Sequence, residues 1–174
     1  MDKDLKSLIA HAQREHDCRP GANSEEIAAA EARLGYSFTD DLRELLCACN
    51  GIKFWKSGEF PCRLLSASEI NPVHLFLDSD EGPRGLIAIL KQEADFVAIG
   101  LDPESKCYSQ LVDCCHETYP YELFAVCNSI QGMLDLILES KGEEWIWPAA
   151  RACGIDLADR TTMPNTSLER TRER

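Results

Sequence analysis

Nine cysteines and four histidines are the side chains of this chain that could bind a metal ion or act as a nucleophile with its base. The closest groupings are Cys47 with Cys49 and the contiguous run Cys114-Cys115-His116. Structural zinc sites pair cysteines with two to four residues between them, and neither grouping has that spacing. Adjacent residues of a strand point to opposite faces, and residues two apart on a helix diverge as well. The spacing therefore favours reduced core thiols over a metal site, and no cofactor is expected.

Catalysis by a cysteine would need a histidine beside it to remove the thiol proton. The histidines are His11, His16, His74 and His116, and none stands in a recognisable catalytic motif. The ten glycines are scattered over turns and helix ends, without a glycine-rich phosphate loop. We therefore expect a protein that is not an enzyme. A small hydrolase that uses one of the cysteines is the third-ranked alternative.

Acidic side chains in two short loops are the sharpest candidates for binding a partner. The candidate partner-binding residues are Asp78, Asp80, Glu81, Asp102, Glu104 and Trp55. Glu93 and Asp95 could extend the same negative face, which would attract a basic protein and speed its association at low salt. Tryptophan is enriched among the residues that dominate interface affinity. A solvated loop and a tryptophan packed in the core are the alternatives to these two roles.

The charge balance supports a basic partner. Lys and Arg number 18 against 30 Asp and Glu, so the net charge is −12. The last fifteen residues hold four arginines and two glutamates, which leaves −14 for residues 1–159. Such a body repels phosphate backbones and anionic lipid surfaces, so we expect neither nucleic acid nor a membrane as partner. Solubility alone is the alternative explanation for the acidity.

The N-terminus and the cysteine count indicate a cytoplasmic protein. The chain opens Met1-Asp2-Lys3-Asp4, which differs from the basic start and apolar core of a signal peptide. It contains no run of apolar residues long enough to span a membrane. An odd number of cysteines without a secretion signal argues against a disulfide framework.

The elements that must position these residues follow from periodicity and turn chemistry. Apolar residues that recur every three or four positions predict four helices. The first spans residues 2–16, and the second begins at Asn23 or Ser24 and stops at Gly35. The third runs from Thr39 to a stop at Asn50-Gly51, and the fourth begins after Ser129. Within the second helix, Glu31 lies on the apolar face, and we expect it to accept hydrogen bonds from backbone N–H groups at the start of the third helix.

Strands are predicted between these helices. Short apolar runs predict strands at 52–55, 62–65, 96–101, 108–114 and 121–126. Residues 86–90 fit either a strand or a helix, and Ser66 with Glu69 predicts a capping box for one helical turn. The order of the predicted elements, with helices first, then antiparallel strands and then a helix, is typical of the α+β class.

Two of these helices carry a resemblance to a known family. The run from Ser24-Glu25-Glu26-Ile27 to Leu34-Gly35, followed by Asp40-Asp41-Leu42-Arg43 and Asn50-Gly51, resembles the opening of the SUKH superfamily. That superfamily includes a yeast cell-wall-synthesis regulator and many bacterial toxin-immunity proteins. The resemblance implies an α+β fold with a mixed, mostly antiparallel sheet flanked by helices. It also implies a binding protein without catalytic residues.

The domain organisation expected from the sequence is one unit with a short extension. Residues 1–159 form a single domain, with a family-like core at 24–138 and an extra helix at 143–153. Trp145 and Trp147 in that helix could make a homodimer contact. Residues 160–174 are polar and expected to be disordered. Within them, the run Pro164-Asn165-Thr166-Ser167-Leu168-Glu169-Arg170-Thr171-Arg172 resembles the translated end of an integron gene cassette.

These observations lead to two functional hypotheses. The first is a bacterial immunity protein that neutralises a basic toxin, for example a nuclease, by occluding it. The alternative is an intracellular regulatory or interaction module, which could be homodimeric and has no toxin partner.

Overall fold

The computed structural model describes residues 4–58, 60–79, 82–105, 107–121 and 123–143. Their helices are α1 (Leu5–Glu15), α2 (Ser24–Leu34), α3 (Asp40–Ala48), α4 (Val73–Phe76) and α5 (Ile130–Ser140). Their strands are β1 (Asp17–Pro20), β2 (Cys49–Phe54), β3 (Cys62–Leu64), β4 (Asn71–Pro72), β5 (Leu86–Gln92), β6 (Asp95–Gly100), β7 (Leu111–Cys114) and β8 (Phe124–Cys127). The predicted extra helix at 143–153, Trp145, Trp147 and the 160–174 tail lie almost entirely outside the described residues.

The strands form one sheet in the order β1-β2-β3-β5-β6-β7-β8, with β4 beside β5. Every pairing between these described strands is antiparallel. A single isolated bridge, between Gly100 and Tyr108, is parallel. The α+β class is confirmed, and residues 86–90, which the sequence left open, lie in a strand.

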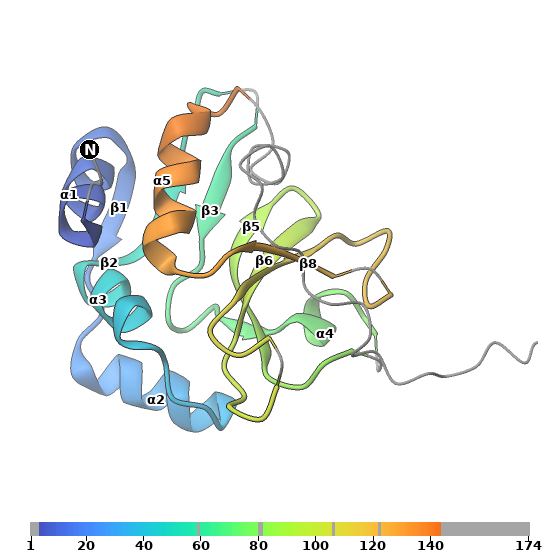
Figure 1. The fold of residues 1–174 in the computed structure, drawn as a ribbon. Helices are drawn as coiled ribbons and strands as arrows, with labels where there is room; N and C mark the ends of the chain where they lie inside the picture. Colours follow the sequence, from blue (N-terminus) through green and yellow to red (C-terminus); the bar gives the residue numbers. More distant parts are fainter. Residues whose placement is uncertain (1–3, 59, 80–81, 106, 122, 144–174) are drawn as a thin grey trace, which may run out of the picture.

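Helices α1, α3 and α5 pack against one another on one side of the sheet (Figure 1). The apolar runs of β5 and β6 are the centre of the core, because apart from the half-buried Lys91 every residue of both strands is buried. Strands with both faces covered are expected to be apolar throughout. On the side away from α5, the ring of Phe76 in α4 stacks on Phe96 of β6, with 4.7 Å between the ring centroids. The β2 and β3 part of the sheet alternates between buried and more exposed residues, so its second face is open.

Local signals placed α2 correctly. The Asn23 side chain accepts from the backbone N–H groups of Glu25 and Glu26, and Glu26 returns a bond to the Asn23 N–H, which is a complete capping box. Gly35 ends the helix with φ of 76°, a conformation that favours glycine.

The prediction for Glu31 is confirmed, and the structure adds a partner. Glu31 Oε1 accepts from the backbone N–H of Phe38 at 2.6 Å, on the approach to α3. The same oxygen accepts from Arg43 Nε at 3.0 Å and from its Nη2 at 2.6 Å. This carboxylate therefore ties α2 to α3.

One local prediction was wrong and two were confirmed only in part. Helix α3 ends at Ala48, and the predicted terminator Asn50-Gly51 lies inside β2, because pairing with β1 and β3 continues the chain as a strand. Thr39 is the N-cap of α3, but its side chain makes no capping hydrogen bond. The Ser66 backbone N–H donates to Glu69 Oε2 as a capping box requires, but the Ser66 hydroxyl donates to the same oxygen, the Glu69 N–H donates to the Ser66 carbonyl, and the segment is a turn.

Candidate functional site

A backbone hydrogen bond connects the end of the first predicted acidic loop to the beginning of the second. One precedes β5 and the other follows β6, and the backbone N–H of Leu101 donates to the carbonyl oxygen of Gly85 at 2.8 Å. Asp102 is half-buried, and its Oδ1 accepts from the backbone N–H of Glu104 at 3.0 Å, which shapes the second loop. Two of the candidate residues, Asp80 and Glu81, lie outside the described residues.

Exposed apolar side chains adjoin both acidic loops along the chain. Asp78 and Glu104 are exposed. Leu75 lies in α4, just before the first acidic loop, and is 65% exposed. Tyr108 follows the second acidic loop and is 48% exposed. Apolar and aromatic side chains among polar ones are typical of protein interfaces. The sequence analysis did not single out Leu75 or Tyr108, because periodicity alone does not show which apolar residues stay outside the core.

The predicted extension of the negative face through Glu93 and Asp95 was wrong. Asp95 begins β6 and Glu93 lies in the turn before it, whereas Asp102 follows the end of β6, about 20 Å from Asp95 at 3.3 Å per strand residue. Asp95 is only 7% exposed and accepts hydrogen bonds from His116. A strand therefore separates the two groups of acids.

Trp55 is held by α5. Its indole Nε1 donates to the carbonyl oxygen of Ile137 at 2.9 Å, and its ring packs edge-on against His16. The side chain is half-buried, so part of its surface is engaged within the fold. A role for Trp55 in partner binding stays a prediction.

Cationic side chains gather on the open face of the sheet, where the sequence analysis predicted none. Lys53 of β2 stands directly opposite Arg63 of β3, and Arg63 stands opposite Lys91 of β5. Residues directly opposite on paired strands project from the same face. We call Lys53, Arg63 and Lys91 the cationic row. Asp17 of β1 stands opposite Lys53 at the end of this row.

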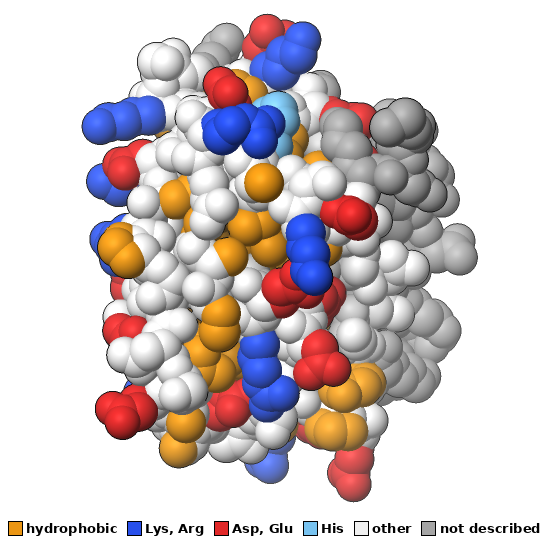
Figure 2. Space-filling model, turned by 90° about the vertical axis from the view of Figure 1, so that its left-hand side faces the viewer, with side chains coloured by type: hydrophobic (Ala, Val, Ile, Leu, Met, Phe, Trp, Pro, Cys, Tyr) orange, Lys and Arg blue, Asp and Glu red, His pale blue; other side chains and the backbone are white. Residues whose placement is uncertain are grey.

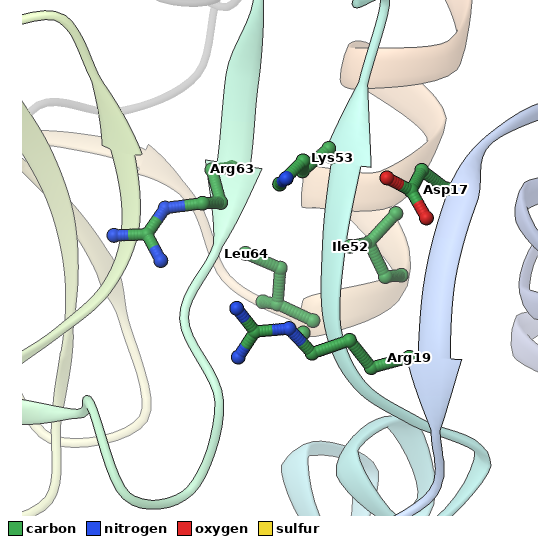
Figure 3. A pocket seen from close by; sticks show the side chains of 7 residues that line it. Asp17, Arg19, Ile52, Lys53, Arg63 and Leu64 are labelled. Atoms are coloured by element: carbon green, nitrogen blue, oxygen red, sulfur yellow. The ribbon is translucent and has the colours of Figure 1, made fainter.

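The cationic row differs in its charge distribution from the side of the molecule that carries α1 and α2. On the side of the molecule that carries α1 and α2, acidic and basic side chains are interspersed (Figure 2). At the row, Lys53 points toward β3 instead of toward Asp17, and Arg19 reaches from β1 across β2 (Figure 3). The fainter ribbon of α5 passes behind these strands, so the row occupies the face opposite that helix.

Glu69 partly neutralises this face. Its carboxylate forms ion pairs with Arg63 and with Arg19, the latter at 3.3 Å. Burial opposes its ionisation, yet hydrogen bonds from the Ser66 hydroxyl, from Arg63 and from the Ser66 backbone N–H together lower the pKa of Glu69 to about 2. Glu69 is therefore ionised under all ordinary conditions.

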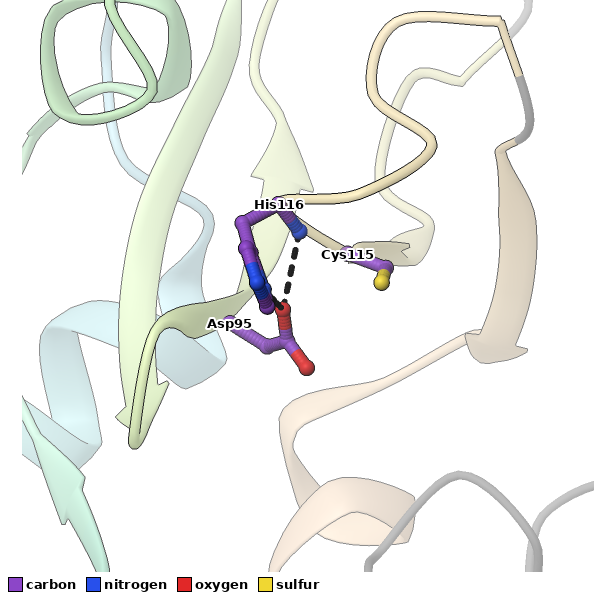
Figure 4. A group of neighbouring side chains, drawn as sticks. All are labelled: Asp95, Cys115 and His116. Atoms are coloured by element: carbon purple, nitrogen blue, oxygen red, sulfur yellow. Dashed lines mark hydrogen bonds and ion pairs between the residues drawn. The ribbon is translucent and has the colours of Figure 1, made fainter.

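A second cluster joins residues that are distant in sequence. Asp95, Cys115 and His116 place a carboxylate oxygen, a thiol and an imidazole nitrogen within 4.8 Å of one another (Figure 4). Asp95 Oδ1 accepts from the backbone N–H of His116 at 2.8 Å and lies 2.7 Å from its Nδ1. The hydrogen bond with Asp95 raises the pKa of His116. Three ligands fall short of the four of a structural zinc site.

Asp95 is the hydrogen-bond acceptor at the centre of this cluster, because its Oδ1 meets both the backbone N–H and the imidazole of His116. Because Asp95 also binds backbone, the cluster fixes the turn that follows β7.

Most cysteines of the described residues are core thiols, as expected. Cys49, Cys62, Cys107, Cys114 and Cys127 are buried, whereas Cys47 is exposed. Burial raises the pKa of Cys62 to about 12, and that of Cys127 to about 12. A thiol held in its protonated form is a poor nucleophile.

The chain matches the sequence model of one protein family. The model is that of the SMI1 / KNR4 family (SUKH-1), and it matches residues 21–136. This range runs from just before α2 into α5, so it includes β2 to β8. A comparison with curated proteins found no match.

Proposed function

Because the chain belongs to the SMI1 / KNR4 family (SUKH-1), we propose that it is a protein-binding module and, more specifically, a bacterial immunity protein that neutralises a toxin by occluding it. The superfamily includes toxin-immunity proteins, and its members typically bind toxin partners. The family is generally non-catalytic. The family match carries the proposal, because it covers the strands and helices that build the fold.

The acidic loops are the surface that we assign to first contact with a basic toxin. Asp78 and Glu104 are exposed, and Leu75 and Tyr108 supply exposed apolar area beside them. Exposed charges on a partner surface mainly change the association rate, whereas apolar contacts at its centre change dissociation. This division of roles gives each residue a distinct kinetic signature.

Rescue from toxicity tests the proposal directly. The protein encoded beside this gene is expressed in a bacterial host with and without the present chain, and co-expression should restore growth. The purified pair should bind, with an association rate that falls as salt is added. Unrestored growth, together with a mass of twice 19.5 kDa in light scattering, would favour the homodimeric regulatory module instead.

Matched variants test the assigned surface. Glu104→Lys should slow association at low salt, and Leu75→Ser should speed dissociation. Glu44→Lys makes the same charge change as Glu104→Lys at an exposed position of α3 and serves as the control. If Glu104→Lys and Glu44→Lys slow association equally, net charge and not this loop governs the encounter.

No helix among the described residues could cross a membrane. The longest, α1, α2 and α5, have 11 residues each, and a bilayer crossing requires about 20.

A further inference from the structure

The cationic row places three like charges side by side, although Arg63 is paired with Glu69 and the Lys91 ammonium lies 5.6 Å from the centre of the Phe96 ring. Neighbouring strands are about 4.8 Å apart, and like charges directly opposite each other destabilise a sheet. In the described part of the chain, no carboxylate lies within ion-pair distance of Lys53 or Lys91. Three cations follow one another across β2, β3 and β5 in a protein of net charge −12. A local arrangement that disagrees with fold stability is typical of a functional surface.

The row borders an open hollow. Lys53, Arg63 and Lys91 line a depression of about 410 Å³ together with Lys56, against one carboxylate, Glu93. Pro61 adds apolar surface to it, whereas the side chain of Phe54, which also borders the hollow, is buried in the core. A smaller hollow of about 50 Å³ shares Lys53 and Arg63 and extends toward β1, where Arg19 lines it. Cations beside the ring of Pro61 suit a ligand that carries carboxylates on short carbon chains.

We propose that this face binds an acidic segment of a partner protein, with its carboxylates over the cationic row. Charge complementarity selects the acidic class of ligand. A nucleic acid is disfavoured, because its phosphates continue beyond the row and meet the acidic remainder of the chain. A short glutamate- or aspartate-rich segment places its charge only where the cations are. This surface is separate from the acidic loops, and the proposal stands whether or not the chain is an immunity protein.

The test uses the full chain and a fluorescein-labelled hexaglutamate peptide, with binding followed by fluorescence anisotropy at low ionic strength. Saturable binding is expected, and Lys53→Gln/Lys91→Gln should weaken it about tenfold, since exposed charge pairs contribute modestly each. The control Lys6→Gln/Arg14→Gln removes two cations from exposed positions of α1 and should change the affinity less than about twofold. A labelled six-nucleotide oligothymidylate serves as the competing polyanion.

A stability measurement separates loss of the site from loss of the fold. Removing two like charges from the row should not lower the melting temperature of Lys53→Gln/Lys91→Gln by more than about 2 °C. Three outcomes would overturn the proposal: no saturable binding of hexaglutamate, equal weakening by the row and control variants, or tighter binding of the oligothymidylate than of hexaglutamate. A row variant that keeps its melting temperature and loses hexaglutamate binding supports it.

Discussion

Glu69→Gln removes one negative charge from the turn between β3 and β4 while it keeps the shape of the side chain. In the native structure Glu69 Oε2 accepts from the Ser66 hydroxyl at 2.6 Å and from the Ser66 backbone N–H at 3.1 Å. Oε1 bonds Arg63. A glutamine amide retains one acceptor oxygen but loses the ion pairs with Arg63 and Arg19. We expect the variant to be less stable at neutral pH.

The pKa of Glu69 sets the magnitude. Burial opposes ionisation, but the Ser66 and Arg63 hydrogen bonds lower the pKa from 4.5 to about 2. Each pKa unit corresponds to 1.36 kcal/mol, so the upper bound is about 3 kcal/mol. The side chain is 33% exposed, and screening by solvent reduces this to about 1–2 kcal/mol. For a chain of this length, the melting temperature should fall by about 2–8 °C.

The pH dependence follows from the direction of the shift. The folded pKa is lower than the unfolded one, so the stabilisation is fully present above the unfolded value of 4.5 and is lost as the pH falls toward about 2. Urea unfolding of wild type and Glu69→Gln between neutral pH and about pH 2 should show a stability difference that shrinks over this window. Glu44→Gln, at an exposed position of α3, is the matched control. A difference that stays constant with pH, or a variant as stable as wild type at neutral pH, would refute the reasoning.

Three further measurements test other parts of the structure. Glu31→Ala should lower the unfolding free energy by about 2–3 kcal/mol, because it leaves Arg43 and a backbone N–H without their acceptor, and an effect below about 0.5 kcal/mol in urea unfolding would contradict this. Trp55→Phe removes the donor to α5 and should cost about 1 kcal/mol in the same assay, so an unchanged midpoint would show that the bond is dispensable. In an NMR titration His16 should deprotonate at a lower pH than His116, because burial lowers the pKa of His16 and the Asp95 hydrogen bond raises that of His116. The reverse order of these two would contradict the assigned contacts.

The sequence predicted those elements whose signals are local. Asn23 and Gly35 bracket α2 because a capping side chain and a left-handed residue act within a few positions. The apolar run of β6 identified a buried strand for the same reason. Strand β1 was missed, since a four-residue edge strand that ends in Pro20 is mostly exposed and has no clear apolar alternation. Its position is decided by pairing with β2.

The candidate sites depended on pairing between distant segments. Lys53, Arg63 and Lys91 are unremarkable in sequence, and the register of β2, β3 and β5 alone puts them in one row. Asp95 meets His116 in the same way, across the β6 and β7 pair. Strands 52–55 and 62–65 were predicted and contain Lys53 and Arg63, but which of their residues stand opposite one another depends on the register. Register is fixed by long-range packing, which composition and spacing do not contain.

Glu69 also connects the stability of the fold to the proposed binding face. Its carboxylate lies against Arg63 and Arg19, so it lowers the positive potential that an acidic ligand would meet at the cationic row. Glu69→Gln should therefore strengthen hexaglutamate binding while it weakens folding. Most variants that damage a fold also weaken its binding sites, so opposite signs in these two measurements are difficult to explain by general disruption. A Glu69→Gln protein that loses both stability and hexaglutamate affinity would show that the face depends on the geometry Glu69 supports rather than on the charge it neutralises.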